Sequence, residues 1–160
     1  MRLRGVAWRA HNPRWAFDPA SGRGAALYGG RFNRPGRPTL YASMRFETAW
    51  LEAQQAFPFK AQPMTLCGYD VDCEDVVDLT DSATLAALGV DHATLACPWE
   101  SLADRLIAEG RAGIVAPSFA FGATGADVNA IFWRWGPDPP HQVRVIDDAG
   151  RLPKNDASWR

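Results

Sequence analysis

The stretch YGGRFNRPGRPTLYASMRFETAWLE, from Tyr28 to Glu52, decides how the rest of the chain is interpreted. Gly29 and Gly30 allow backbone angles that other residues avoid, and they leave room for a ligand to approach the chain. Arg31 follows directly, and its planar guanidinium can bind phosphate or carboxylate oxygens through two parallel hydrogen bonds. We therefore expect an anion-binding turn here.

The second half of this stretch predicts a strand and then a helix. Residues 37–43 follow turn signals and read as a strand. A carboxylate beside the buried face of a helix, as expected for Glu52, is costly unless it has a partner or a task. The alternative for Glu52 is an ion pair with a surface arginine, which is the commoner fate of such a residue. The helix is predicted from apolar residues at the spacing of one face: Phe46, Ala49, Trp50, Ala53 and Phe57.

Composition limits the class of protein. The chain has 160 residues, of which 47% are hydrophobic, so we expect one globular domain. Its formal net charge of -1 provides no overall attraction to nucleic acid or to an anionic membrane. Five arginines nevertheless gather near the opening stretch, which suits either an anionic small ligand or a solvated surface: Arg23, Arg31, Arg34, Arg37 and Arg45.

Cysteine and histidine usage point to a reduced, metal-free protein. Three irregularly spaced cysteines favour free thiols and a cytoplasmic setting. The three histidines lie far apart and form no ligand pair with the cysteines, so we expect no metal site. No apolar run has the length of a signal peptide or a membrane span. The acidic residues between 70 and 78 lack the calcium-loop pattern and are interpreted as a solvated turn.

The remaining chain predicts a mixed α/β (α+β) domain of about six strands and three helices. Residues 13–27 and 119–127 read as loops, and residues 148–160 as a polar C-terminal tail after a domain at 1–147. Further helices are expected at 81–88 and 98–109. Further strands are expected at 5–10, 64–72, 113–118, 128–133 and 142–146, and residues 76–80 are a candidate for one more short strand.

The order and spacing of these pieces resemble a RES domain, from Trp8 to about Val145. The resemblance rests on Arg31 after Gly-Gly, Leu-Tyr-Ala-Ser at 40–43 with Glu52 on the next helix, and Pro-Ser at 117–118. The family is named for its Arg, Glu and Ser, which here match Arg31, Glu52 and Ser118. Phe32 stands where the family often has Trp, and Asn129 on a later strand completes the match.

This resemblance implies a fold similar to that of ADP-ribosylating toxins and a role as the toxin of a bacterial toxin–antitoxin pair. The implied co-substrate is NAD, with no metal, and residues 1–147 would form the NAD-binding catalytic domain. ADP-ribose would go to a protein acceptor, with an enzyme of nucleotide synthesis as one candidate; release to water or phosphate is the nearest alternative. A cognate antitoxin would block the site, and no membrane or direct nucleic-acid partner is expected.

The resemblance also assigns roles to single residues. Cleavage of the nicotinamide–ribose bond passes through an oxocarbenium-like state, which the carboxylate of Glu52 would stabilise. Arg31 would hold the pyrophosphate, Tyr41 would stack on nicotinamide or ribose, and Ser118 would bind the ribose or carboxamide. Taken singly, an ion pair, a core tyrosine and a turn-forming serine are commoner. A non-catalytic nucleotide- or RNA-binding module is the rival from another class. Two further contacts are expected from Arg9 and Asn129.

Overall fold

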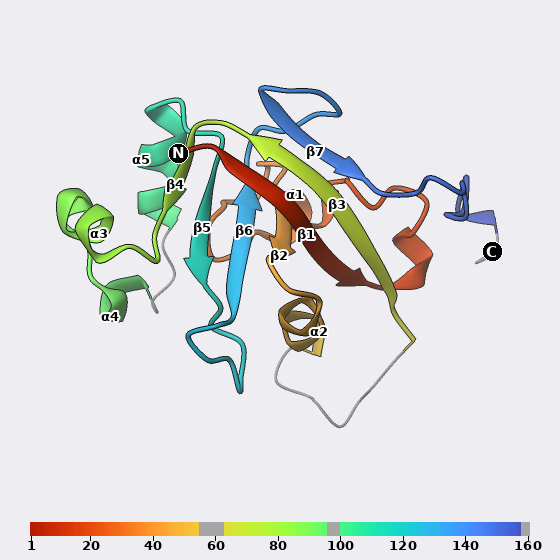
Figure 1. The fold of residues 1–160 in the computed structure, drawn as a ribbon, viewed down its shortest axis with the longest axis horizontal. Coiled ribbons are helices and arrows are strands. Elements are labelled where there is room, and N and C mark those ends of the chain that lie inside the picture. Colours follow the sequence, from red (N-terminus) through yellow and green to blue (C-terminus); the bar gives the residue numbers. More distant parts are fainter. Residues whose placement is uncertain (55–62, 96–99, 158–160) are drawn as a thin grey trace.

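The computed structural model describes residues 1–54, 63–95 and 100–157, and these form a single compact α+β domain. Its centre is a seven-stranded mixed sheet in the order β4-β5-β6-β2-β1-β3-β7 (Figure 1). All neighbouring strands are antiparallel except the parallel pair β4 and β5. The predicted fold class is therefore confirmed. The strands are β1 (Leu3–His11), β2 (Leu40–Ser43), β3 (Thr65–Cys73), β4 (Val76–Asp78), β5 (Gly113–Pro117), β6 (Val128–Phe132) and β7 (His141–Val145).

The helices lie around the two ends and one face of this sheet. Helices α3, α4 and α5 gather at the β4 end, whereas α2 lies below the middle strands in the view of Figure 1. In the parts of the chain that the structure describes, no helix combines the length and the apolarity needed to span a bilayer. The helices are η1 (Pro13–Trp15, a 3-10 turn), α1 (Arg23–Tyr28), α2 (Phe46–Gln54), α3 (Ser82–Leu88), α4 (His92–Leu95) and α5 (Glu100–Ala108).

Two clusters of buried side chains fill the two faces of the sheet. The first includes Ala7, Leu40 and Tyr69 and has members on every strand of the sheet. The second includes Leu106 and Ile131 and joins α3 and α5 to β5 and β6. Side chains along a strand alternate between faces. The neighbours of Ala7 and Leu40, which are Trp8 and Tyr41, therefore point to the opposite face, where α2 packs.

Several predicted elements differ from those observed. The expected loop at 13–27 contains η1 and most of α1, and the short helix α4 was not predicted. The expected apolar stripe of α2 is only partly buried, since Phe46 and Trp50 are 52% and 40% exposed. Thr48 is fully buried instead, because its hydroxyl donates to the Asp127 carboxylate at 2.6 Å. The predicted helix end at Phe57 and the positions Pro98 and Trp99 lie outside the described residues.

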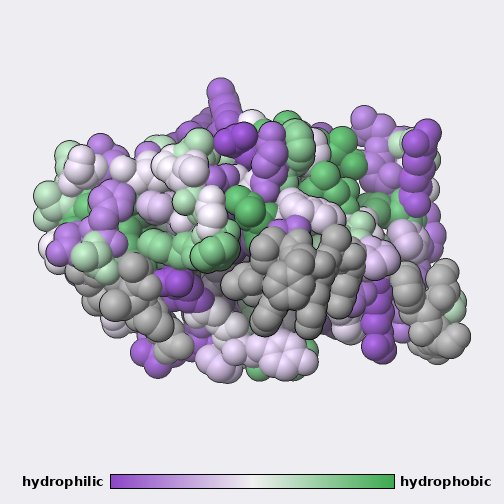
Figure 2. All heavy atoms as spheres, turned by 90° about the horizontal axis from the view of Figure 1, so that it is seen from below, coloured by the Kyte–Doolittle hydropathy of each residue, from purple (hydrophilic) through white to green (hydrophobic). Residues whose placement is uncertain are grey.

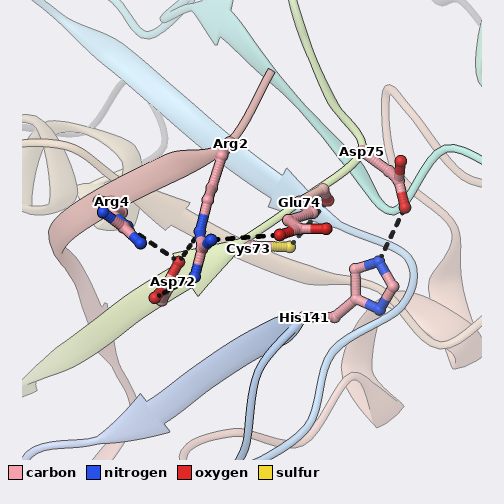
Figure 3. Close-up of polar contacts among 7 residues, drawn as sticks. All are labelled: Arg2, Arg4, Asp72, Cys73, Glu74, Asp75 and His141. Carbon is pink, nitrogen blue, oxygen red and sulfur yellow. Dashed lines mark hydrogen bonds and ion pairs between the residues drawn. The ribbon is translucent and has the colours of Figure 1, made fainter.

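Acidic residues at the end of β3 and just after it form ion pairs with basic side chains of the neighbouring strands (Figure 3). Asp72 accepts from Arg2 at 2.8 Å and lies 3.3 Å from Arg4, and these guanidinium groups lower its pKa to about 2. Asp75 accepts from His141 Nε2 at 3.0 Å, and this bond lowers the pKa of the Asp75 carboxyl. These carboxylates therefore connect β1, β3 and β7.

Candidate active site

Glu52 is the centre of a hydrogen-bonded cluster contributed by three elements. It lies near the end of α2, and its Oε1 accepts from the Ser118 hydroxyl at 2.6 Å and from the Asn129 amide. Ser118 follows β5 directly, and Asn129 is the second residue of β6. No described residue donates to Glu52 Oε2, and none places a cation within ion-pair distance of this carboxylate. The alternative of a surface ion pair is thus wrong for the described part of the chain.

The register of the sheet positions Asn129. Ser43 of β2 lies opposite Asn129 of β6, and the Ser43 hydroxyl donates to Asn129 Oδ1 at 2.7 Å. An amide whose oxygen accepts a hydrogen bond must turn its NH2 group the other way, towards Glu52. The serine therefore fixes the amide orientation that the carboxylate needs.

Tyr41 is oriented by a buried asparagine. Its hydroxyl donates to Asn33 Oδ1 at 2.8 Å and accepts from the Phe32 backbone N–H at 3.0 Å. Burial raises the pKa of Tyr41 to about 12, so the phenol is neutral at physiological pH. The Asn33 amide also donates to carbonyls at Ala25, Arg34 and Arg37, which closes the turn after Gly-Gly. The loop thereby holds the Tyr41 hydroxyl in place.

The two glycines before Arg31 serve different needs. Gly29 has a φ of 71°, in the region that favours glycine. A Cβ on Gly30 would lie 2.6 Å from the Tyr41 hydroxyl and 2.8 Å from Asn33 Oδ1. The close approach at Gly30 is therefore made by Tyr41, within the protein, and it explains why no larger residue fits there.

Arg31 is presented to the same region as Glu52. Its guanidinium carbon lies 4.3 Å from the centre of the Phe119 ring, and Nη1 donates to the Leu95 carbonyl at 3.3 Å. A guanidinium stacked on an aromatic ring keeps N–H groups at its edge for further hydrogen bonds. Two other members of the predicted arginine group form ion pairs, since Arg34 binds Asp104 at 2.6 Å and Arg45 lies 3.4 Å from Glu47. The basic surface is therefore smaller than the sequence predicts.

Two hollows of about 280 Å³ each meet at the carboxylate. Tyr41, Glu52 and Asn129 line both of them. The first hollow also contains Arg31, Phe119 and Phe121, and the second contains Trp8 and Arg9. Figure 2 views the molecule from below, the side on which α2 lies in Figure 1, and hydrophilic and hydrophobic residues are interspersed there. A ligand lying across Glu52 would thus contact one arginine on each side.

Most of the residues predicted for the site line the first hollow, and Arg9 lines the second. The structure brings Arg31, Tyr41, Glu52 and Asn129 to one hollow, with Ser118 bonded to Glu52 at its edge. The sequence did not predict the roles of Asn33 and Ser43, which orient Tyr41 and Asn129. Their signal was weak, because a polar residue next to a turn is usually a turn former. Among the described residues, no group of three His, Cys, Asp or Glu side chains is arranged to hold a metal ion.

Comparison with known proteins identifies the family. The RES domain matches residues 6–155, which is nearly the whole chain. The chain belongs to the RES domain family. Its fold is similar to that of a chain in the crystal structure of the M. tuberculosis MbcT-MbcA toxin-antitoxin complex, with a TM-score of 0.61 and 19% sequence identity. The alignment covers 92% of this RES protein and 84% of that chain. No curated protein sequence matches this RES protein.

Proposed function

We propose that this RES protein is the toxin of a toxin–antitoxin pair that cleaves the nicotinamide–ribose bond of NAD and transfers ADP-ribose to a protein acceptor. The observation that carries the proposal is the position of Glu52. Its carboxylate lies between two hollows and is held by two neutral donors, with no cation beside it in the described residues. Family membership and the fold shared with a chain of a toxin-antitoxin complex support it.

The chemistry follows from where positive charge develops. As the bond between ribose C1′ and the pyridinium nitrogen breaks, its electron pair leaves with the nitrogen and nicotinamide departs neutral. The ribose becomes oxocarbenium-like, and a fixed carboxylate stabilises this state more than it stabilises bound NAD. A nucleophile of the acceptor then bonds to C1′ and releases its proton. Glu52, oriented by Ser118 and Asn129, would supply the carboxylate.

The other site residues suit the rest of the dinucleotide. Arg31 and Arg9 lie on opposite sides of Glu52, in the first and second hollows, and each offers a guanidinium to the diphosphate. Tyr41 lines both hollows, so its ring can pack on the nicotinamide or the ribose. We assign the activity to residues 1–147.

Incubation of the purified protein with NAD tests this function. We expect nicotinamide release, measured by chromatography, together with label from adenine-labelled NAD on a protein of a cell extract. Rapid turnover without extract would favour hydrolysis, and a requirement for phosphate would favour phosphorolysis. Salt-sensitive RNA binding without nicotinamide release under any of these conditions would contradict the proposal.

We further propose a cognate antitoxin that covers the two hollows. The similar fold occurs in a toxin-antitoxin complex, and uncontrolled NAD loss would harm the host cell. Acidic side chains or a chain terminus of the partner would bind the guanidinium groups of Arg31 and Arg9. Added partner should stop nicotinamide release, and unchanged turnover in a stable complex would contradict this proposal.

A further inference from the structure

A third groove, of about 300 Å³, adjoins the second hollow at Arg9 and is lined by residues of η1, α1 and the end of β1. Its walls are mainly apolar and aromatic, and they include Trp15, Phe17 and Leu27. Trp15 and Leu27 are 54% and 71% exposed. Apolar walls with a few placed polar groups are typical of small-molecule sites. The size suits a nucleoside better than a helix of a partner protein.

Arg9 connects this groove to the active site, because it lines both the third groove and the second hollow. Strands β1 and β2 are paired only at Trp8 opposite Ser43, whereas β1 pairs with β3 at nine positions. The sheet therefore opens between β1 and β2 beyond this pair. The second hollow contains Tyr41 and Ala42, consecutive residues whose side chains point to opposite faces, so it extends into that opening.

The charge of Arg9 indicates what passes through the opening. Arg9 is half-buried, and its Nη1 donates to the backbone carbonyls of Ser21 at 3.3 Å and Pro19 at 3.5 Å. Within residues 1–54, 63–95 and 100–157, no carboxylate lies at ion-pair distance from it. A partly desolvated cation whose described partners include no carboxylate favours an anionic ligand.

The aromatic wall suits a flat ring. The ring centres of Trp15 and Phe17 are 6.3 Å apart, and the Arg14 guanidinium lies 5.4 Å from the centre of the Trp15 ring. These contacts hold the indole in place although it is solvent-exposed. Exposed, oriented aromatic rings beside an arginine are the arrangement that binds a base together with its phosphates.

We propose that the third groove is the adenosine subsite of the dinucleotide. The adenine ring lies against Trp15, the diphosphate lies at Arg9, and the nicotinamide riboside continues through the opening to Glu52. This inference rests on the proposed function, because it assigns one end of the same substrate.

Binding of substrate fragments tests the subsite without requiring turnover. The probes are AMP, ADP-ribose and nicotinamide mononucleotide, titrated by calorimetry into the wild type, Trp15→Ala and Trp50→Ala. Trp15→Ala removes one base stack, so it should lower the affinity for AMP and for ADP-ribose about tenfold. The affinity for nicotinamide mononucleotide should not change. Trp50 is the matched control, since it is 40% exposed on α2 and lines none of the three hollows.

A second variant fills the groove without removing a ring. Gly24 lines the groove in α1, and a Cβ built on it meets nothing within 4 Å, so Gly24→Leu should fold and obstruct adenine. Equal AMP affinity in wild type, Trp15→Ala and Gly24→Leu would overturn the subsite. Variants that weaken the binding of an antitoxin and leave the affinity for AMP unchanged would overturn it as well. If NAD is not cleaved but AMP binding depends on Trp15, the proposed function fails and the adenosine site stands.

Discussion

Replacement of Glu52 by glutamine separates its charge from its shape. The amide oxygen of Glu52→Gln can still accept from Ser118 and Asn129, the two donors that now bind Oε1. Hydrogen bonds to a charged group contribute about 1.5–3 kcal/mol, against about 0.5–1.5 kcal/mol for neutral pairs, so each bond weakens by about 1 kcal/mol. Removal of a partly buried charge offsets part of that loss. We expect a small change in melting temperature.

The catalytic effect should be much larger than the change in stability. Loss of one preorganised electrostatic contact to a developing charge costs about 2.7–4 kcal/mol, which is about a hundred- to a thousandfold in rate. Binding of NAD should change little, because the charge matters most as the bond breaks. Nicotinamide release and thermal unfolding measured on the same sample give both quantities.

A matched control lies on the same helix. Glu47 is exposed at the start of α2, pairs with Arg45 at 3.4 Å and lines none of the hollows. Glu47→Gln should therefore leave turnover unchanged. Normal turnover in Glu52→Gln would remove this carboxylate from the mechanism, and equal losses in both variants would show a general effect on α2.

Two further predictions concern stability. Tyr41→Phe leaves the buried Asn33 oxygen without its hydroxyl donor, and it should lower the free energy of unfolding by about 1–3 kcal/mol, measured by denaturant titration. Arg2 and Arg4 lower the pKa of Asp72 from 3.8 to about 2. Between these two pH values the folded protein therefore binds fewer protons at Asp72 than the unfolded protein does. Its contribution is present above pH 3.8 and is lost as pH falls towards 2, so Asp72→Asn should flatten the fall of melting temperature in that range, whereas an unchanged slope would contradict it.

Local sequence signals were sufficient for most of the sheet and for the ends of α3. Asp81 caps α3 by accepting from Thr84 N–H at 2.8 Å, and Gly89 ends it in the left-handed conformation, so the helix lies within one residue of the predicted range 81–88. The strands β3 and β5 also follow their apolar patterns within one or two residues. Such signals act between near neighbours in sequence, which is why a single sequence reveals them.

The missed features depend on partners that are distant in sequence. Thr48 is buried because Asp127 lies beside it, and Ser43 has a role only because β2 pairs with β6. The sequence pattern placed Phe46 in the core, but it packs at an edge against Trp8 with ring centres 6.1 Å apart. Helical spacing identifies which residues share a face; it does not show what covers that face.

Asp127 links the helix and the loop that together build the hydrogen-bonded cluster around Glu52. One carboxylate oxygen accepts from Thr48 of α2, the other accepts from Thr124 N–H at 2.8 Å, and its backbone carbonyl accepts from Ser118 N–H at 2.8 Å. Thr48 and Glu52 are four residues apart and therefore share one side of α2. The bond to Thr48, which also lowers the pKa of Asp127, thus fixes the helix face that carries Glu52, while the bond to Ser118 fixes the hydroxyl that meets it. Asp127 thus positions both the acceptor Glu52 and its donor Ser118. Because this arrangement needs no substrate, the carboxylate is already oriented to stabilise a developing charge.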